Sequence, residues 1–260
     1  MTILETITQY KKWEVASKKE IWPVSVLERS LYFEKETLSL THFLKKSTTG
    51  IIAEHKRKSP SKSVINDTLT LPEAVKGYEL AGASGISVLT DTAFFGGSLD
   101  DLSLARKTVT LPILRKEFII DPYQLFEAKA YGADAILLIA ACLSKAEVKQ
   151  FSELAKQLQL EVLVEIHHEK ELEIALLPSV DIIGVNNRNL KTFEVSLQNS
   201  IQLAQKIPSG FLKISESGIH STEDIKTLKK YGFEGFLIGE LFMKTKNPGE
   251  TLKNFISTIS

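Results

Sequence analysis

The sequence predicts an α/β protein, a (β/α)8 TIM barrel with an N-terminal helical extension. Eight short apolar or β-branched runs recur along the 260 residues, and segments with helical spacing lie between them. The runs are nearly continuous in apolar character, which is typical of parallel strands covered on both faces. A doubly wound open sheet is the alternative. No Gly-x-Gly-x-x-Gly follows the first run, which removes the dinucleotide-binding version of that fold.

The predicted strands and the helix boundaries between them follow the chain in order. The strands are residues 51–53, 86–89, 113–114, 135–139, 162–164, 182–185, 212–214 and 235–238. Asp121 is expected to cap one helix, and Ser144 and Ser221 each open a capping box. Gly132 and Gly232 are expected to end helices in the left-handed conformation. These signals predict a helix after most of the strands.

Residues 1–48 precede the first predicted strand and indicate one or two helices. This extension contains Trp13 and Trp22. Two interpretations stay open, a cap over the bottom of the barrel and a lid near the mouth of the active site. We expect residues 1–260 to form a single domain, because α/β barrels commonly reach this size as one unit.

Composition limits the classes of partner. The chain has 32 basic and 32 acidic residues, so no basic excess indicates nucleic acid, and any attraction for an anionic substrate must be local. The lone Cys142 is expected to be a small buried hydrophobe, and no Cys/His spacing indicates a metal site. The longest apolar stretch, 135–143, is too short to span a membrane, and the N-terminus lacks a signal-peptide pattern. A cytoplasmic protein is expected.

Ionisable and amide side chains gather at the ends of the predicted strands, where barrels of this kind hold their active sites. Glu54 and Lys56 follow the first strand, Lys116 the third and Glu165 the fifth. Burying unpaired charges is costly, so these groups should pair with one another. A salt-bridge ring that only stabilises the barrel is one explanation. A purely structural role is plausible for any one of these four residues but is not expected for all four together. A site that tunes acid and base strengths is therefore favoured.

Other residues have competing interpretations. Glycines in the loops after the seventh and eighth strands, Gly218 and Gly239, indicate either a phosphate site or two ordinary tight turns. The segment 94–98 after the second strand is either a structural turn or an apolar wall for a ring substrate. We expect His55 to face the surrounding helices. Exposed positions are expected for His167, His168, Arg106, Lys107, Lys229 and Lys230.

Six motifs, in order along the chain, are similar to those of the indole-3-glycerol-phosphate synthases. They are residues 54–61, 113–119, 161–165, 183–190, 215–219 and 236–240. Each motif alone is weak, but the ordered set is specific and, with the extension, covers nearly the whole chain. The resemblance implies that 1-(2-carboxyphenylamino)-1-deoxyribulose 5-phosphate is converted to indole-3-glycerol phosphate, carbon dioxide and water. It also implies a monomer that needs no metal or organic cofactor.

The resemblance further implies roles for particular residues. Lys116 resembles the acid that protonates the sugar ketone during ring closure. Glu165, Lys56 and Glu54 match the groups for the other proton transfers, in an order left open because coupled charges share their protons. Asn186 resembles a holder of the sugar hydroxyls and Glu216 a group that orients the lysines. The implied substrate-binding residues are Ser59, Phe95, Phe118, Leu137, Arg188, Ser217, Gly218, Gly239 and Glu240.

Three positions depart from the usual pattern of that family. Glu117 stands where aspartate is usual, Ser63 where many members have glycine, and Glu240 where some have serine. A carboxylate would repel a phosphate, so we expect Glu240 to offer its backbone N–H and turn its side chain away.

Competing functions are a phosphoribosylanthranilate isomerase-like barrel, a Schiff-base aldolase using Lys56 or Lys116, and a non-catalytic phosphosugar-binding barrel.

Overall fold

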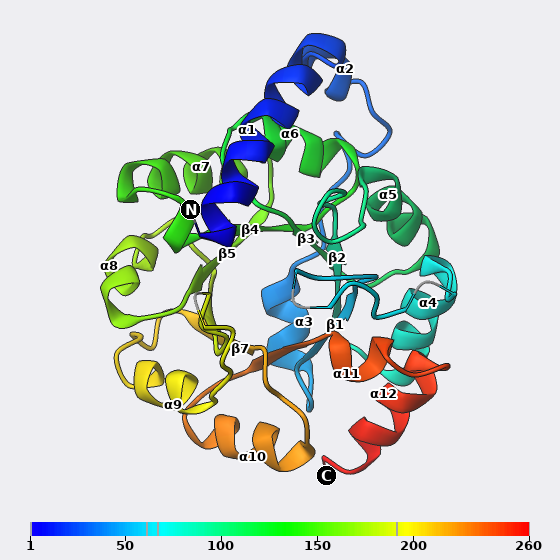
Figure 1. Cartoon of the computed structure of the whole chain (residues 1–260), viewed down its shortest axis with the longest axis vertical. Coiled ribbons are helices and arrows are strands. Elements are labelled where there is room, and N and C mark those ends of the chain that lie inside the picture. The colour runs from blue at the N-terminus through cyan, green and yellow to red at the C-terminus, as the bar shows by residue number, and fades with distance from the viewer. Residues whose placement is uncertain (1, 61, 67, 191, 260) are drawn as a thin grey trace.

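Eight parallel strands close into a barrel in the computed structural model, which describes residues 2–60, 62–66, 68–190 and 192–259. The strands neighbour one another in sequence order, and β1 pairs with β8 to close the barrel (Figure 1). Ser61, which ends the first motif, lies outside the described residues. The strands are β1 (Ile51–His55), β2 (Gly85–Leu89), β3 (Ile113–Lys116), β4 (Ala135–Ile139), β5 (Glu161–Ile166), β6 (Ile182–Asn186), β7 (Leu212–Glu216) and β8 (Gly235–Ile238). The predicted barrel and all of its strands are confirmed.

Helices surround the barrel as an outer ring (Figure 1). Ser144 and Ser221 form the predicted capping boxes, and Gly132 and Gly232 are left-handed, with φ of 88° and 80°. The ring contains α4 (Leu71–Ala81), α5 (Leu99–Thr108), α6 (Tyr123–Ala130), α7 (Lys145–Gln157), α8 (Leu172–Ala175), α9 (Gln198–Ala204), α10 (Thr222–Lys230) and α12 (Pro248–Ser257). Three shorter elements complete it: η1 (Ala140–Cys142), η2 (Glu169–Glu171) and α11 (Glu240–Met243).

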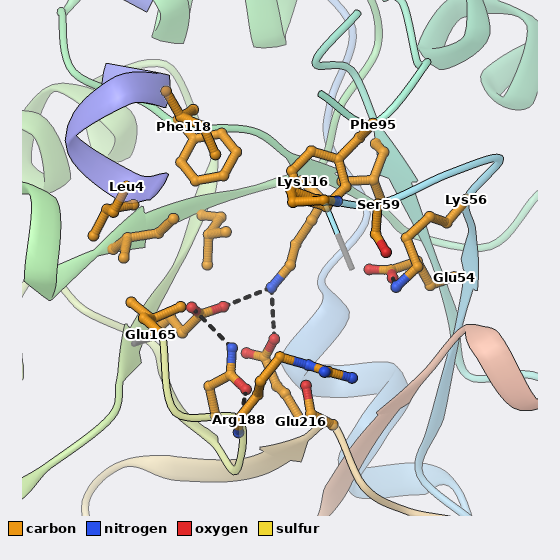
Figure 2. A pocket seen from close by; sticks show the side chains of 18 of the residues that line it. Leu4, Glu54, Lys56, Ser59, Phe95, Lys116, Phe118, Glu165, Arg188 and Glu216 are labelled. Atoms are coloured by element: carbon orange, nitrogen blue, oxygen red, sulfur yellow. Dashed lines mark hydrogen bonds and ion pairs between the residues drawn. The ribbon is translucent and has the colours of Figure 1, made fainter. Parts of the chain in front are cut away.

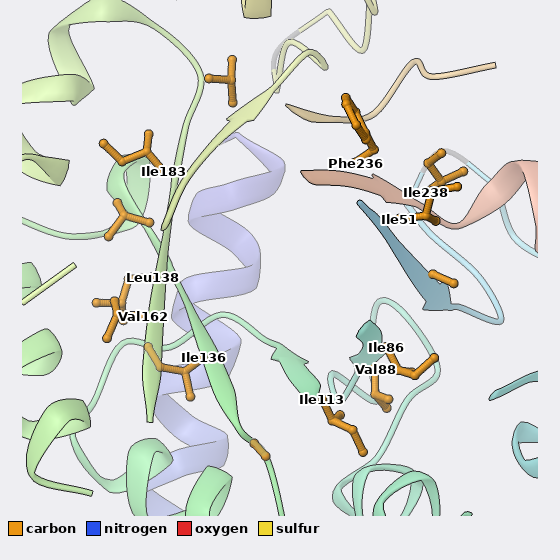
Figure 3. Packing of buried hydrophobic residues seen from close by; sticks show 14 of the residues in the cluster. Ile51, Ile86, Val88, Ile113, Ile136, Leu138, Val162, Ile183, Phe236 and Ile238 are labelled. Carbon is orange, nitrogen blue, oxygen red and sulfur yellow. The ribbon is translucent and has the colours of Figure 1, made fainter. Parts of the chain in front are cut away.

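Alternation along the strands divides the buried strand residues into two clusters. Outward-facing strand residues pack against the helices; they include Ile51, Ile86, Ile113, Ile136, Val162, Ile183 and Phe236 (Figure 3). Inward-facing residues fill the barrel; they include Ile52, Leu114, Leu137, Leu163, Ile182, Ile214 and Leu237. This two-sided burial explains why the strands appear in the sequence as nearly continuous apolar runs. His55 is on the outward side as expected, 2% exposed.

The N-terminal extension contacts both ends of the barrel. It forms α1 (Ile3–Ile21), α2 (Val24–Leu27) and α3 (Leu40–Lys46). Leu40 and Leu44 of α3 join the inner cluster at the bottom of the barrel, and Thr41 donates to the Glu161 carboxylate at the start of β5. The first turns of α1 instead border a cavity at the opposite end. Helix α3 therefore covers the bottom of the barrel, and α1 lies at the mouth, where the lid interpretation would place it.

Of the four basic helix residues that were predicted to be exposed, three are exposed: Lys107, Lys229 and Lys230. The prediction is wrong for Arg106, which donates to Asp134 at 2.8 Å and is largely covered. The aspartate immediately precedes β4 and draws the guanidinium inward. No helix among the described residues is long and apolar enough to cross a membrane.

Candidate active site

Four charged side chains form one layer at the carboxyl ends of alternate strands. Glu54, Lys116, Glu165 and Glu216 belong to β1, β3, β5 and β7. Two positions earlier on each of these strands is a residue of the inner apolar cluster: Ile52, Leu114, Leu163 and Ile214. Because side chains two apart on a strand share a face, all four charges point into the barrel. In this architecture, alternate strands supply one layer of the interior, and here the uppermost such layer is ionic.

Lys116 lies at the centre of this layer. Its Nζ is 2.7 Å from Glu165 Oε2 and 2.5 Å from Glu216 Oε2 (Figure 2). Burial alone would lower the pKa of Lys116, but Glu165, Glu216 and Glu54 outweigh it and raise the pKa above its ordinary value. The lysine is therefore held as an ammonium. A Schiff-base nucleophile needs the opposite shift, so the aldolase interpretation loses Lys116.

Glu165 is held as a carboxylate by cationic and amide partners. Asn186 on β6 donates from Nδ2 to Glu165 Oε1 at 3.2 Å, and accepts at Oδ1 from the Arg188 backbone N–H. Burial would raise the pKa of Glu165, but Lys116 and His167 hold it well below the usual value. Asn186 is thus a direct neighbour of the Glu165 carboxylate.

Glu216 has the opposite tendency. Burial and the nearby Glu165 and Glu54 raise its pKa to about 7, although Lys116 opposes the shift. Two carboxylates in one layer thus have pKa values driven apart, an arrangement typical of acid–base sites. Gly184 on β6 makes room for Glu216, since a Cβ there would lie 2.4 Å from Glu216 Oε1. Sequence reasoning missed Gly184, although a glycine inside a strand is a signal of close approach.

Lys56 and Glu54 form the second predicted pair, with Lys56 Nζ 2.9 Å from Glu54 Oε1. Ser87 on β2 donates to the other oxygen of Glu54 at 3.1 Å. Gly239 lies against this carboxylate, because a Cβ at Gly239 would be 2.9 Å from Glu54 Oε1. The absence of a side chain at this position therefore leaves space for Glu54.

Apolar side chains form one wall of the cavity above the charged layer. The rings of Phe95 and Phe118 (Figure 2) lie 5.8 Å apart at 39°. Leu137 belongs to the same lining. Ile3, Leu4 and Ile7 of α1 add to the lining from above. The enclosed space is about 180 Å³. Phe95, from the segment 94–98, thus belongs to the apolar lining of the cavity.

Polar residues complete the lining. Ser59, Arg188 and Ser217 border the cavity as predicted, and Ser217 and Gly218 have φ of 66° and 76°. Gly218 faces away from the cavity, since a Cβ there would meet Val195 at 2.3 Å. The left-handed backbone at both residues makes a tight turn beside the cavity.

Glu240 borders the cavity, and its carboxylate forms an ion pair with Lys62, which is not part of the cavity lining. This contact, together with the charges of Lys56 and Arg188, lowers the pKa of Glu240. Local cations therefore compensate the negative charge that a phosphate would encounter there.

A second charged network was not foreseen. Lys11 of α1 is 1% exposed, and its Nζ lies 2.8 Å from Glu14, 2.9 Å from Asp91 and 3.1 Å from Glu117. Asp91 also accepts from the backbone N–H of Phe95 at 3.1 Å. The network thereby joins α1 to a loop that forms the apolar wall. In the sequence, Lys11 has the ordinary pattern of a solvated helix lysine, which explains the miss.

Two further predictions are corrected or refined. His167 is not exposed: its side chain is 8% accessible and lies 3.3 Å from Glu165 and 3.6 Å from Glu171, whereas His168 is exposed as predicted. Cys142 is partly buried, and burial followed by the charges of Glu165 and Glu171 raises the pKa of its thiol to about 12. This shift opposes the acid–base cysteine of an isomerase.

Among the described residues, no group of His, Cys, Asp or Glu side chains is arranged to hold a metal ion.

Comparisons with known proteins identify one family. The family model described as indole-3-glycerol phosphate synthase matches residues 4–255. An indole-3-glycerol phosphate synthase of Bacteroides thetaiotaomicron is 48% identical, covering 99% of this chain and 98% of the relative. Those of Legionella pneumophila (strain Paris) and Delftia acidovorans are 43% and 40% identical, covering 98% and 96% of this chain and 99% and 97% of the relatives.

Solved structures agree on the fold. The α-subunit of tryptophan synthase from Pyrococcus furiosus superposes with a TM-score of 0.58 at 16% identity, covering 81% of this chain and 97% of that one. This likeness supports the barrel alone. The family match over nearly the whole length, with relatives above 40% identity, is much more specific. The chain belongs to the indole-3-glycerol phosphate synthase family.

Proposed function

We propose that the cavity above the charged layer converts 1-(2-carboxyphenylamino)-1-deoxyribulose 5-phosphate to indole-3-glycerol phosphate, carbon dioxide and water, in tryptophan biosynthesis. The family supports the reaction. The observation that carries the assignment of the site is the ammonium of Lys116, 2.7 Å and 2.5 Å from the carboxylates of Glu165 and Glu216. An ammonium group held in this position can donate a proton directly to a substrate oxygen in the cavity.

In the proposed reaction, the ring carbon bearing the carboxylate attacks the sugar ketone. Lys116 donates a proton to the ketone oxygen as the carbon–carbon bond forms. Carbon dioxide then leaves, and the electrons of its bond return to the ring. Loss of the new hydroxyl as water needs an acid, and loss of a ring or nitrogen proton needs a base. Glu165 and the Lys56–Glu54 pair are the proposed groups, while Glu216 orients Lys116.

The lining supports a matching arrangement of the substrate. We assign the aromatic ring to the wall formed by Phe95, Phe118 and Leu137, where exclusion of water keeps the reacting carbons close. The sugar hydroxyls are assigned to Asn186. The phosphate and the carboxylate are assigned to four residues of the lining, Ser59, Arg188, Ser217 and Glu240, and to the adjacent Gly218 and Gly239. The backbone N–H groups of Ser217, Gly218, Gly239 and Glu240 are proposed to bind the phosphate.

Formation of indole-3-glycerol phosphate, followed by the rise of indole fluorescence, tests this function. We expect an active wild type and a Lys116→Ala variant slowed by about 10²–10⁴-fold, since one general acid typically contributes that much. Lys230→Ala removes an exposed lysine far from the cavity and is the matched control. Circular dichroism must show that each variant is folded.

The other outcomes separate the alternatives. Full activity in Lys116→Ala would move the acid to another group, with Lys56 the first candidate. An inactive wild type that still binds the phosphosugar would favour the non-catalytic barrel.

We further propose that residues 1–260 form one domain and work as a monomer. The support is that α1 and α3 pack on the two ends of the same barrel, and that one chain supplies the whole lining described above. A cytoplasmic location stays a prediction from the sequence, which fractionation of cells would check.

A further inference from the structure

Glu165 lies next to the side chains of Lys116 and His167. Lys116 approaches its Oε2 at 2.7 Å, and Nε2 of His167 lies 3.3 Å from its Oε1. The Glu165 side chain is 5% exposed and that of His167 is 8% exposed. His167 lines a second cleft of about 840 Å³ beside the barrel mouth rather than the substrate cavity. The histidine therefore approaches Glu165 from outside the cavity.

The position of His167 is itself supported. Its backbone N–H donates to Glu171 Oε2 at 2.5 Å, and its carbonyl accepts from Asn199 Nδ2 at 3.0 Å. Its ring Nδ1 lies 3.6 Å from Glu171. A carboxylate thus lies beside each ring nitrogen, and only the imidazolium has a hydrogen on both. Burial alone would lower the pKa of His167, but Glu165 and Glu171 raise it to about 9.

We propose that His167, as an imidazolium, is a positioning residue that fixes the Glu165 carboxylate and stabilises its negative charge at Oε1, the oxygen that Lys116 does not contact. The inference rests on the proposed function only for the role of Glu165 in proton transfer. When Lys116 gives its proton to the ketone oxygen, it becomes neutral and no longer balances Glu165. The charge on His167 persists through that step, so Glu165 keeps one cation beside it.

Other titratable groups border the same cleft and must be considered. They are Cys142, Glu171, His168, Arg188, Glu5 and Glu194. His168 contacts Glu171 at 3.1 Å but is itself 60% exposed. It therefore shares the outer carboxylate with His167 without facing Glu165. This relation makes His168 the matched control for the neighbouring ring.

The experiment compares His167→Asn with His168→Asn in the full chain. Carbon-13 NMR of the side-chain carboxyl carbons, assigned with Glu165→Gln, gives the pKa of Glu165 directly. We expect His167→Asn to raise that pKa by about one unit or more, which is typical for loss of an adjacent opposite charge. His168→Asn should leave it within a few tenths of a unit. His167→Lys retains a cation and should restore much of the shift.

Kinetics provides the second measurement. If Glu165 acts as a base, the acidic limb of kcat/KM should move to higher pH in His167→Asn, with kcat reduced more than KM changes. A purely structural clamp on the loop would instead alter thermal stability and leave the pKa of Glu165 unchanged, which would overturn the proposal. If His167→Asn does not fold, Glu171→Gln should produce a smaller shift in the same direction, and no shift would be equally damaging. The pKa of Glu165 could shift in His167→Asn while the wild-type protein has no synthase activity. That outcome would reject the proposed function but would still support the electrostatic role of His167.

Discussion

Gly184 leaves space for one of the charged side chains of the site. The residue is on β6, and its open face is occupied by the carboxylate of Glu216. That carboxylate contacts Lys116, the proposed acid. A methyl group at Gly184 would therefore act on Lys116 through Glu216, without touching the cavity.

We expect Gly184→Ala to lower kcat by about 10–100-fold, because small misplacements of a catalytic group can cost that much. The added Cβ would also lie 3.0 Å from Leu163, so the strand has little room to adjust. Gly210→Ala is the matched control, since nothing lies within 4 Å of a Cβ there. Steady-state kinetics of both variants makes the comparison. Equal kcat values would mean that the contact between Glu216 and Lys116 does not limit the reaction.

Prediction from sequence succeeded for residues whose position on a strand defines their direction. Lys116 and Glu165 come at strand ends with apolar residues two positions before them, so their convergence follows from alternation. His167 comes after β5 has ended, where alternation no longer applies. Its burial depends on Glu171 and Asn199, and no local pattern in the sequence indicates those contacts.

The helix α1 illustrates the same limit for whole elements. Its helical pattern was readable, but its placement over the cavity depends on Lys11 meeting Asp91 and Glu117. These partners come from β2 and β3 loops far along the chain. The strands were easier to predict, because parallel strands that are covered on both faces appear as nearly continuous apolar runs.

Removing the charge at the centre of that network should loosen α1. We expect Lys11→Met to lower the free energy of unfolding by an amount on the order of 3–5 kcal/mol, since buried carboxylates lose their cation. If α1 helps to hold substrate, KM should also rise several-fold. Lys12→Met changes an exposed neighbour and is the control. A folded Lys11→Met variant with the wild-type KM would show that α1 does not contribute to substrate binding.

Deleting residues 1–45 would be a less clean test of the lid. Such a truncation removes Leu40 and Leu44 from the bottom of the barrel together with α1 at the mouth. A changed affinity could then follow from either end. The point variants keep the two contacts separate.

At the scale of the molecule, we predict a single cooperative unfolding transition and a monomeric mass. The expectation follows from one closed barrel whose two ends are covered by the same N-terminal segment. Calorimetry and sedimentation at working concentration check both points. A dimeric mass would contradict the prediction. It would direct attention to the exposed apolar residues of α1, where Trp13 is 64% and Ile21 is 68% exposed.

The contact between α3 and β5 has a consequence for synthesis of the chain. Thr41 finds its partner Glu161 only 120 positions later in the sequence. At about 5–20 residues per second, that interval lasts roughly 6–24 s on the ribosome. During this time Leu40 and Leu44 have no finished barrel to enter. The hydrogen bonds between α3 and β5 can therefore form only after Glu161 has been synthesised, long after α3 itself.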